Sequence, residues 1–238
     1  MPPVSPAQIV CRVLLTASLL PGLGNAASHA AEVKAQLVMS TGRTIEPASE
    51  KSLSAVIWLK TLQPGAARPP ASGKFILLQK NKMFIPHLLV VPVGSSVAFP
   101  NADPFFHNVF SLFDGKRFDL GLYEAGSTRS VVFSRVGVSY IFCNIHSEMS
   151  AVVIALDTPF YSLADRRGAF RIEDVPDGDY SLHVWIEGQT QSSLDQLTRR
   201  VHIAGPVATL DDIRAGKPAQ QHLNKFGRPY EPDAEPTY

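Results

Sequence analysis

Four side chains of this sequence have the types needed to bind a soft metal ion. Cys143, His146 and Met149 lie at intervals of three residues in the run C-N-I-H-S-E-M. His107 lies upstream, in the run D-P-F-F-H-N-V. Two imidazoles and a thiolate in one plane, with a weak axial thioether, are the ligands of a mononuclear copper centre that transfers electrons. The sequence therefore predicts a copper site formed by His107, Cys143, His146 and Met149.

Each of the four residues has a commoner use when it is considered alone. A free cysteine is usually a small buried apolar residue, and methionine usually fills gaps in a core. The joint occurrence of the four types at this spacing is what favours a metal site. Zinc bound by Cys143 and the two histidines, with an open fourth position, is the alternative metal site. His87 is a further candidate ligand, and we expect it to lie at the surface or at a strand edge instead.

The residues around these ligands have the pattern of short strands separated by turns. Turn residues such as Gly94, Gly115 and Gly126 separate apolar segments, and no long helical period occurs between them. This pattern is typical of an antiparallel sandwich. The predicted strands comprise residues 88–93, 96–99, 108–112, 130–133, 138–143 and 151–156.

The segment 74–157 resembles the cupredoxin family. The resemblance is carried by F-I-P from Phe84, by G-S-S-V-A-F-P-N from Gly94, by F-H-N-V around His107 and by the Cys143 loop, which is similar to the short ligand loop of amicyanins. It implies a Greek-key sandwich with one type 1 copper ion that passes single electrons between redox partner proteins, and not an enzyme. The four metal ligands it implies are those named above.

The predicted site also suggests which residues surround the metal. We expect the Asn108 side chain to link its segment to the Cys143 loop, and backbone N–H groups near the thiolate to tune its potential. An apolar patch around His146 is the expected docking surface for the redox partner. Four aromatic residues are expected to keep the site dry: Phe105, Phe106, Phe110 and Phe142.

The flanks of this segment have a β pattern of their own. The run G-A-F-R-I-E-D-V-P-D-G-D-Y-S-L from Gly168 resembles the signature of transthyretin-like, carboxypeptidase-regulatory-type domains. We therefore expect residues 32–73 and 158–205 to form one discontinuous β-domain, with the cupredoxin-like domain, residues 74–157, inserted between them. The predicted fold class is all-β: a Greek-key sandwich plus a second small β-sandwich. Residues 206–238 are expected to be a poorly ordered tail with a short helix near 209–214.

The N-terminus has the order of a secretory signal peptide. Arg12 precedes an apolar stretch, and small residues suitable for cleavage follow at Ala26, Ala27 and Ala30. The prediction is a signal peptide at residues 1–30 and a periplasmic mature protein with no membrane span; a retained anchor is the alternative. Cleavage leaves Cys143 as the lone cysteine, and metal ligation is one of few stable uses for such a thiol in an exported protein.

Composition limits the remaining function classes. The net charge of +1 gives no case for a nucleic-acid partner. No H-x-H pair is present to supply the second metal site of a copper oxidase or nitrite reductase, and four methionines are too few for a copper-storage tract. A non-redox metal-binding protein, or a module that binds carbohydrate or a partner protein, remains the alternative function.

Overall fold

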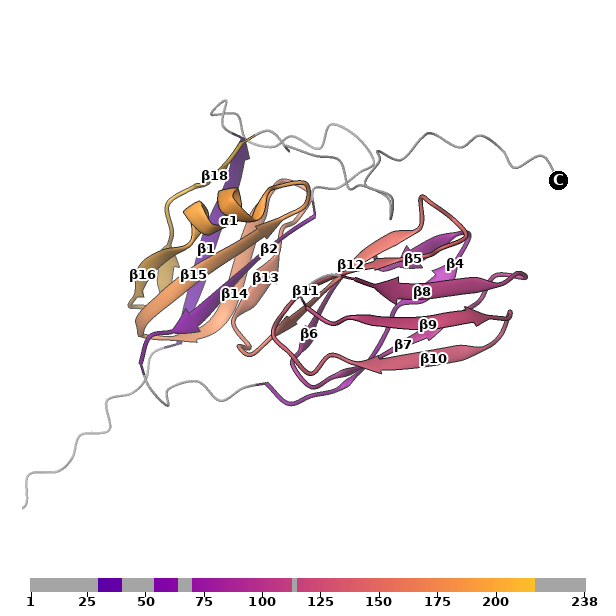
Figure 1. Ribbon diagram of the computed structural model, residues 1–238. Helices are drawn as coiled ribbons and strands as arrows, with labels where there is room; N and C mark the ends of the chain where they lie inside the picture. The colour runs from indigo at the N-terminus through magenta and orange to yellow at the C-terminus, as the bar shows by residue number, and fades with distance from the viewer. Residues whose placement is uncertain (1–29, 40–53, 64–69, 113–114, 217–238) are drawn as a thin grey trace, which may run out of the picture.

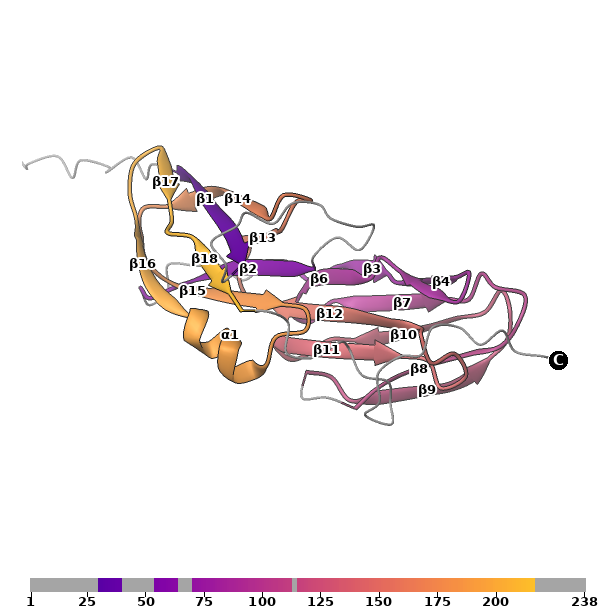
Figure 2. The ribbon, with the colours of Figure 1, turned by 90° about the horizontal axis from the view of Figure 1, so that it is seen from above.

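The computed structural model describes residues 30–39, 54–63, 70–112 and 115–216. The predicted all-β class is confirmed, since the described residues form strands and one short helix, α1 (Gln191–Leu197). The strands form two lobes, seen side by side in Figures 1 and 2. We call residues 70–157 the central lobe. The described residues of 30–63 and 158–216 are the flanking lobe.

Two sheets and a hairpin make up the central lobe. The larger sheet has the order β6 (Leu88–Pro92), β12 (Ser150–Leu156), β11 (Gly137–Phe142), β8 (His107–Ser111), β9 (Phe118–Tyr123). The smaller sheet has the order β10 (Thr128–Val132), β7 (Ser96–Pro100), β3 (Lys74–Ile76). The hairpin consists of β4 (Leu78–Lys80) and β5 (Met83–Ile85).

The flanking lobe is formed by segments that precede and follow the central lobe in the chain. One sheet has the order β14 (Ala169–Pro176), β1 (Ala30–Met39), β17 (Val207–Thr209), and β18 (Ile213–Ala215) also pairs with β1. The other has the order β13 (Tyr161–Leu163), β2 (Ala55–Thr61), β15 (Gly178–Ile186), β16 (Arg199–Ile203). The two flanks therefore pair with each other, as a discontinuous domain requires. Its likeness to a transthyretin-like family stays a prediction.

The expected tail is wrong in its first residues. Residues 207–209 and 213–215 are strands that lie parallel to β1, and the expected helix near 209–214 is absent from these described residues. Ile213 and Ala215 are buried in the core of the flanking lobe, and this burial holds the segment in place. The expected tail beyond residue 216 and the predicted signal peptide, up to residue 29, lie outside the described residues.

Strand β12 is buried on both faces. Ala151, Val153 and Ala155 pack into the core of the central lobe, which also contains Cys143 and Met149. The residues between them, Val152, Ile154 and Leu156, belong to the core of the flanking lobe. Side chains of a strand alternate between its two faces, so an uninterrupted apolar run is what burial on both sides requires. The two lobes thus share one sheet as a common wall.

Polar contacts also join the lobes. The Trp185 indole N–H donates to the Tyr140 hydroxyl over 3.4 Å. Lys60 Nζ lies 3.0 Å from an Asp157 carboxylate oxygen. His87 Nε2 lies 2.7 Å from a Glu187 carboxylate oxygen. His87 was expected at the surface or at a strand edge, and its half-buried ring lies beside β12, with Nδ1 3.2 Å from the Ser150 carbonyl oxygen.

The burial of β12 between the two lobes leads to a prediction about stability. Ile154→Ala should lower the free energy of unfolding by about 2–5 kcal/mol, because it leaves a cavity between the lobes. The matched control is Ile76→Ala, since the Ile76 side chain is 61 % exposed; its cost should stay within about 0.5 kcal/mol. Denaturant unfolding measures both variants, and an equal loss in the two would contradict the shared core.

Candidate metal centre

The segment 143–149 is the connection between β11 and β12. Phe142 and Ser150 are paired residues at the ends of these two strands. The Cys143 N–H donates to the Met149 carbonyl oxygen, and the Met149 N–H donates to the His146 carbonyl oxygen, each over 3.1 Å. The segment is therefore a loop that is closed by two backbone hydrogen bonds.

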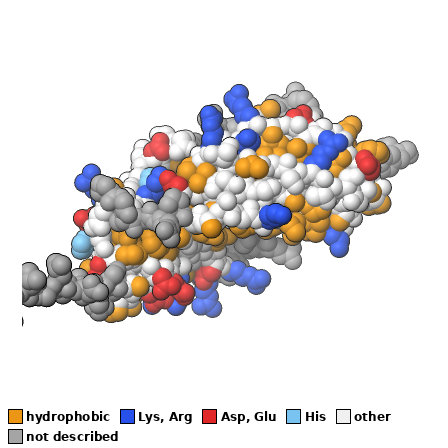
Figure 3. All heavy atoms as spheres, turned by 90° about the horizontal axis from the view of Figure 1, so that it is seen from below, with side chains coloured by type: hydrophobic (Ala, Val, Ile, Leu, Met, Phe, Trp, Pro, Cys, Tyr) orange, Lys and Arg blue, Asp and Glu red, His pale blue; other side chains and the backbone are white. Residues whose placement is uncertain are grey.

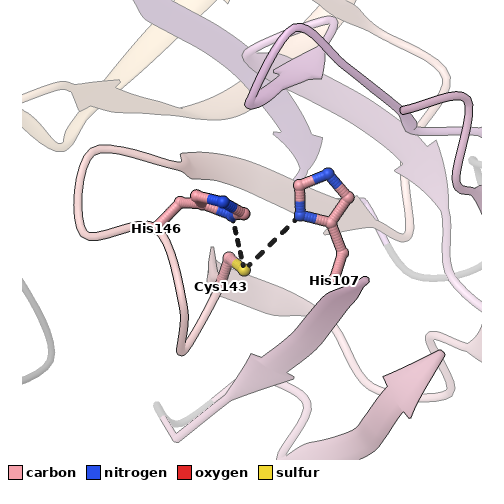
Figure 4. Close-up of side chains that lie close together, drawn as sticks. All are labelled: His107, Cys143 and His146. Atoms are coloured by element: carbon pink, nitrogen blue, oxygen red, sulfur yellow. Dashed lines mark hydrogen bonds between the residues drawn. The ribbon is translucent and has the colours of Figure 1, made fainter. Parts of the chain in front are cut away.

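The structure brings together three of the four sequence-predicted ligands. His107 begins β8, which pairs with β11 through Phe110 and Phe142. Cys143 Sγ lies 3.7 Å from His107 Nδ1 and 3.7 Å from His146 Nδ1. One ligand atom from each of the three residues lies within 4.8 Å of the others. Figure 4 shows the three side chains pointing toward one another.

The three side chains differ in their exposure. His107 and Cys143 are buried, and His146 is half-buried on its loop. The Phe105 ring lies against both imidazoles, with centroid distances of 5.2 Å to His107 and 5.4 Å to His146. The site is therefore closed on the side of His107, and His146 is its most accessible member.

Hydrogen bonds in the site favour the thiolate form of Cys143. Burial acts to raise the pKa of this thiol, because it disfavours the charged form. The contact with His107 and the backbone N–H groups of Asn108, His146 and Ile145 act against burial and hold the pKa of Cys143 below its ordinary value. This outcome fits the expectation that backbone N–H groups surround the thiolate. The thiolate is the form of cysteine that binds metals.

The two imidazoles are shifted in opposite directions. Burial acts to lower the pKa of His107, but its contacts with Cys143 and Asp103 raise that pKa above the ordinary value. Burial lowers the pKa of His146, and the positive charges of His107 and Lys82 lower it further. His146 is therefore the more readily deprotonated of the two rings, and neutral imidazole is the form that binds a metal.

The spacing of the three donor atoms fits a single metal ion. A sulfur at about 2.3 Å and a nitrogen at about 2.0–2.1 Å from one ion, at an angle of 110–120°, are separated by roughly 3.5–3.8 Å. Both sulfur–nitrogen separations here are 3.7 Å. A thiolate with two imidazoles is also a donor set that copper and zinc accept. His107, Cys143 and His146 thus have the chemistry and the separations that such an ion needs.

Met149 is placed by its backbone and its burial. Its side chain is buried in the core that contains Cys143, and its backbone closes the ligand loop. Both features keep it beside the three donor residues. Its role as an axial ligand stays a prediction.

Several expectations about the surroundings of the site are wrong. The Asn108 side chain donates to the Asp119 carboxylate over 2.7 Å and so links β8 to β9, not to the Cys143 loop. Phe106 is 55 % exposed. Phe110 and Phe142 are buried but pack against each other, outside the cluster that contains Cys143, because they alternate with the inward Val109 and Ile141. Of the four aromatic residues, Phe105 contacts the imidazoles.

A buried carboxylate beside His107 was missed by the sequence analysis. His107 Nε2 lies 2.9 Å from Asp103 Oδ2, and Asp103 is 5 % exposed. Asn101 supports this segment: its side chain accepts from the Asp103 N–H over 3.0 Å and donates to the Phe105 carbonyl oxygen over 2.8 Å. The available signal was an acidic residue four positions before a candidate ligand, since carboxylates often orient metal-binding histidines.

A buried phenol near the thiolate was also missed. Tyr123 is paired with His107 across β8 and β9 and is 1 % exposed. Its hydroxyl donates to the Phe99 carbonyl oxygen over 2.9 Å and accepts from the Gln79 amide. Burial raises the pKa of Tyr123 to about 12, with a further contribution from Cys143. The phenol therefore stays protonated and adds no charge to the site.

Among the comparisons with known proteins, matches were found to solved structures. No protein-family model and no curated protein sequence matches the chain. A purple cupredoxin from Nitrosopumilus maritimus is 25 % identical, with a TM-score of 0.32, over 36 % of this chain and 100 % of the other. A reduced amicyanin variant is 21 % identical, with a TM-score of 0.33, over 42 % of this chain and 98 % of the other. A copper-containing nitrite reductase from Thermus scotoductus is 22 % identical, with a TM-score of 0.33, over 41 % of this chain and 25 % of the other. At these scores the matches carry no conclusion about function, which has to come from the residues of the chain itself.

Proposed function

We propose that this protein binds one copper ion through His107, Cys143, His146 and Met149 and carries single electrons between redox partner proteins. The observation that carries the proposal is the convergence of Cys143 Sγ with one ring nitrogen of each histidine within 4.8 Å. A bound copper ion would supply the one-electron couple between Cu(I) and Cu(II). The protein's own part is to hold the donors in one arrangement that suits both states.

The described residues support a fixed arrangement. Cys143 and His107 are attached to paired strands, and the 143–149 loop is closed by two backbone hydrogen bonds. Burial of Cys143 and Met149 in one packed core restricts their rotamers. Little movement of the donors is then needed when the charge of the site changes. Such a site suits electron transfer, because its reorganisation is small.

We propose a carrier and not an enzyme, since the other described histidines already have different partners. His87 lies against Glu187, and His202 Nδ1 lies 2.7 Å from an Asp179 carboxylate oxygen. The His183 ring stacks on Trp58 with a centroid distance of 5.4 Å. A copper enzyme of the oxidase or nitrite reductase type would need further histidines at a second metal.

The redox partner is proposed to dock beside His146. Phe106 and Ile145, which precede His107 and His146 in sequence, are 55 % and 51 % exposed. Lys82 is close enough to lower the pKa of His146, and its neighbour Met83 is also exposed. Apolar side chains next to Lys and Arg occur elsewhere on the surface as well, as Figure 3 shows for one face. The patch is therefore assigned by its position next to the most accessible ligand and not by its composition.

Export to the periplasm remains part of the proposal. The signal peptide at residues 1–30 lies outside the described residues except for Ala30, which begins β1 and pairs with Pro176. Cleavage after Ala26 or Ala27 would leave β1 whole, whereas cleavage after Ala30 would remove its first residue. Among the described residues, no helix has the length and apolar character needed to cross a membrane.

The first test of this function is the spectrum of the copper-loaded protein. We expect an intense thiolate-to-Cu(II) absorption band in the visible region, together with an EPR signal, and both should disappear in Cys143→Ser. His202→Ala is the control and should keep them, because His202 pairs with Asp179 in the flanking lobe. A colourless wild-type protein that retains zinc would contradict the redox function and support the zinc alternative.

The axial role of Met149 has its own test. Met149→Leu should keep the visible band but raise the reduction potential, because the axial donor helps to set the potential. Leu and Met have similar volumes, so the variant should lose less than about 1.5 kcal/mol of stability. Met83→Leu is the control, since Met83 is 52 % exposed on β5. Equal potentials in the two variants, measured by redox titration, would rule out axial ligation.

The docking patch can be tested without knowing the partner. Electron self-exchange between two copies of the protein requires their accessible ligands to approach each other. Ile145→Lys should slow this exchange at least about tenfold, because it places like charges at the contact. Leu163→Lys, on β13 of the flanking lobe and 44 % exposed in the wild type, should leave the rate unchanged. NMR line broadening in mixtures of the reduced and oxidised protein gives the rate, and an unchanged rate in Ile145→Lys would place the contact elsewhere.

A further inference from the structure

The Asp103 carboxylate connects two parts of the central lobe that are separate in sequence. Its Oδ2 lies 2.9 Å from His107 Nε2 and accepts the Lys82 backbone N–H over 2.9 Å. Its Oδ1 accepts the Asn81 backbone N–H over 2.6 Å. Asp103 is thus bonded both to a candidate ligand and to the turn between β4 and β5.

This turn has an unusual backbone. Asn81 and Lys82 both have positive φ values, 55° and 56°. Two successive residues other than glycine in this region carry a conformational cost. The two hydrogen bonds to Asp103 offset that cost, because the conformation points both N–H groups at one carboxylate. The turn carries Lys82, whose positive charge lowers the pKa of His146, so we include the turn in the proposed docking patch.

We propose that Asp103 is a positioning residue that holds His107 in the tautomer needed for metal binding and couples the β4–β5 turn to the metal site. The proposal rests on the proposed function in that His107 is taken as a metal ligand. Asp103 contacts His107 at Nε2, whereas the candidate donor atom of this ring is Nδ1. It therefore acts on the site through the ring.

The tautomer follows from which atom faces the carboxylate. An ionised carboxylate can accept but not donate a hydrogen bond, so Nε2 of a neutral His107 must carry the proton. The lone pair of the neutral ring is then on Nδ1, the atom 3.7 Å from Cys143 Sγ. Fixing the tautomer and ring orientation in this way is what carboxylate partners do for metal-binding histidines.

The coupling follows from sharing one carboxylate. A contact that moves the turn must either break its bonds to Asp103 or move the carboxylate with it. Because Asp103 is buried, water cannot replace a lost partner at low cost. A partner protein that presses on the turn would therefore displace the His107 ring, although the turn touches no candidate ligand atom of His107.

The competing explanation is that Asp103 holds the turn and nothing else. Asp165 provides the matched comparison, since its Oδ1 accepts two backbone N–H groups, from Arg167 and Ala169, each over 2.8 Å. This turn lies in the flanking lobe. Asp165→Asn should therefore reproduce the loss of a turn-holding carboxylate without any effect on the metal site.

The experiment compares Asp103→Asn, Asp103→Leu and Asp165→Asn. Asp103→Asn should weaken Cu(II) binding by about 10- to 100-fold. It should weaken Cu(I) binding less, because the lost carboxylate charge attracts Cu(II) more strongly than Cu(I). Each tenfold difference between the two losses raises the reduction potential by about 59 mV. Asp165→Asn should change neither affinity.

A readout without metal is the tautomer of His107, taken from imidazole ¹⁵N shifts of the metal-free protein at a pH where the ring is neutral. The wild type and Asp165→Asn should carry the proton on Nε2, whereas Asp103→Leu should show a mixture of tautomers. Asn81→Val, which cannot easily keep a positive φ, should weaken Cu(II) binding more than Asn81→Gly, which keeps both the N–H and the conformation.

Two outcomes would overturn the proposal. One is an unchanged His107 tautomer in Asp103→Leu, or in Asp103→Ala if the leucine variant does not fold, because neither side chain can accept a hydrogen bond from Nε2. The other is an equal change of Cu(II) affinity in Asp103→Asn and Asp165→Asn. A wild-type protein that binds no copper would instead overturn the proposed function, and the tautomer measurement would still decide the role of Asp103.

Discussion

Burial of β12 on both faces is the constraint on which the rest of the structure depends. The strand presents Val152, Ile154 and Leu156 to the flanking lobe and the smaller set Ala151, Val153 and Ala155 to the central lobe. A slip of one residue would exchange these sets, placing large side chains in the tighter core and leaving cavities in the other. The register of β12 against β11 is therefore fixed, and with it the pairing of Phe142 with Ser150.

The positions of the candidate metal ligands follow from this register. Because both ends of the 143–149 loop are held, Cys143 and Met149 enter the same core from opposite ends of one closed turn. His107 is added by the pairing of β8 with β11, so the donors come from two strands of a single sheet. The described residues of the flanking lobe contribute no donor, but they pack on the outer face of β6, β12 and β11 and so restrict the movement of the two strands that hold the ligand loop.

The parts of the site that were predictable are those that depend on local spacing. Cys143, His146 and Met149 lie in one run, and their types alone suggest the chemistry. The inward position of Cys143 also implied that Phe142 points the other way, so the error about Phe142 and Phe110 was avoidable from the alternation of a strand. The role of Asp103 depends instead on the β4–β5 hairpin, which becomes its neighbour when the chain folds. The strands at 207–209 and 213–215 form by pairing with β1, which their local sequence does not indicate. Helix α1 buries one side chain, Leu194, so it has little apolar periodicity, and its capping residue Thr190 was the main sequence feature that indicated it.

The distribution of charge explains how a thiolate and a carboxylate coexist in one buried site. The pKa of Asp103 and that of Cys143 are both held below their ordinary values, although burial acts to raise each. Backbone N–H groups from Asn81, Lys82, Ile145 and His146 are among the groups that offset the burial, so the protein solvates two negative charges with dipoles that are already oriented. Two such charges neutralise a divalent cation and exceed a monovalent one by a single charge. Because a buried net charge is costly, the two negative charges would favour the divalent state of a bound ion, and the positive charge of Lys82, which also lowers the pKa of His146, would reduce that preference.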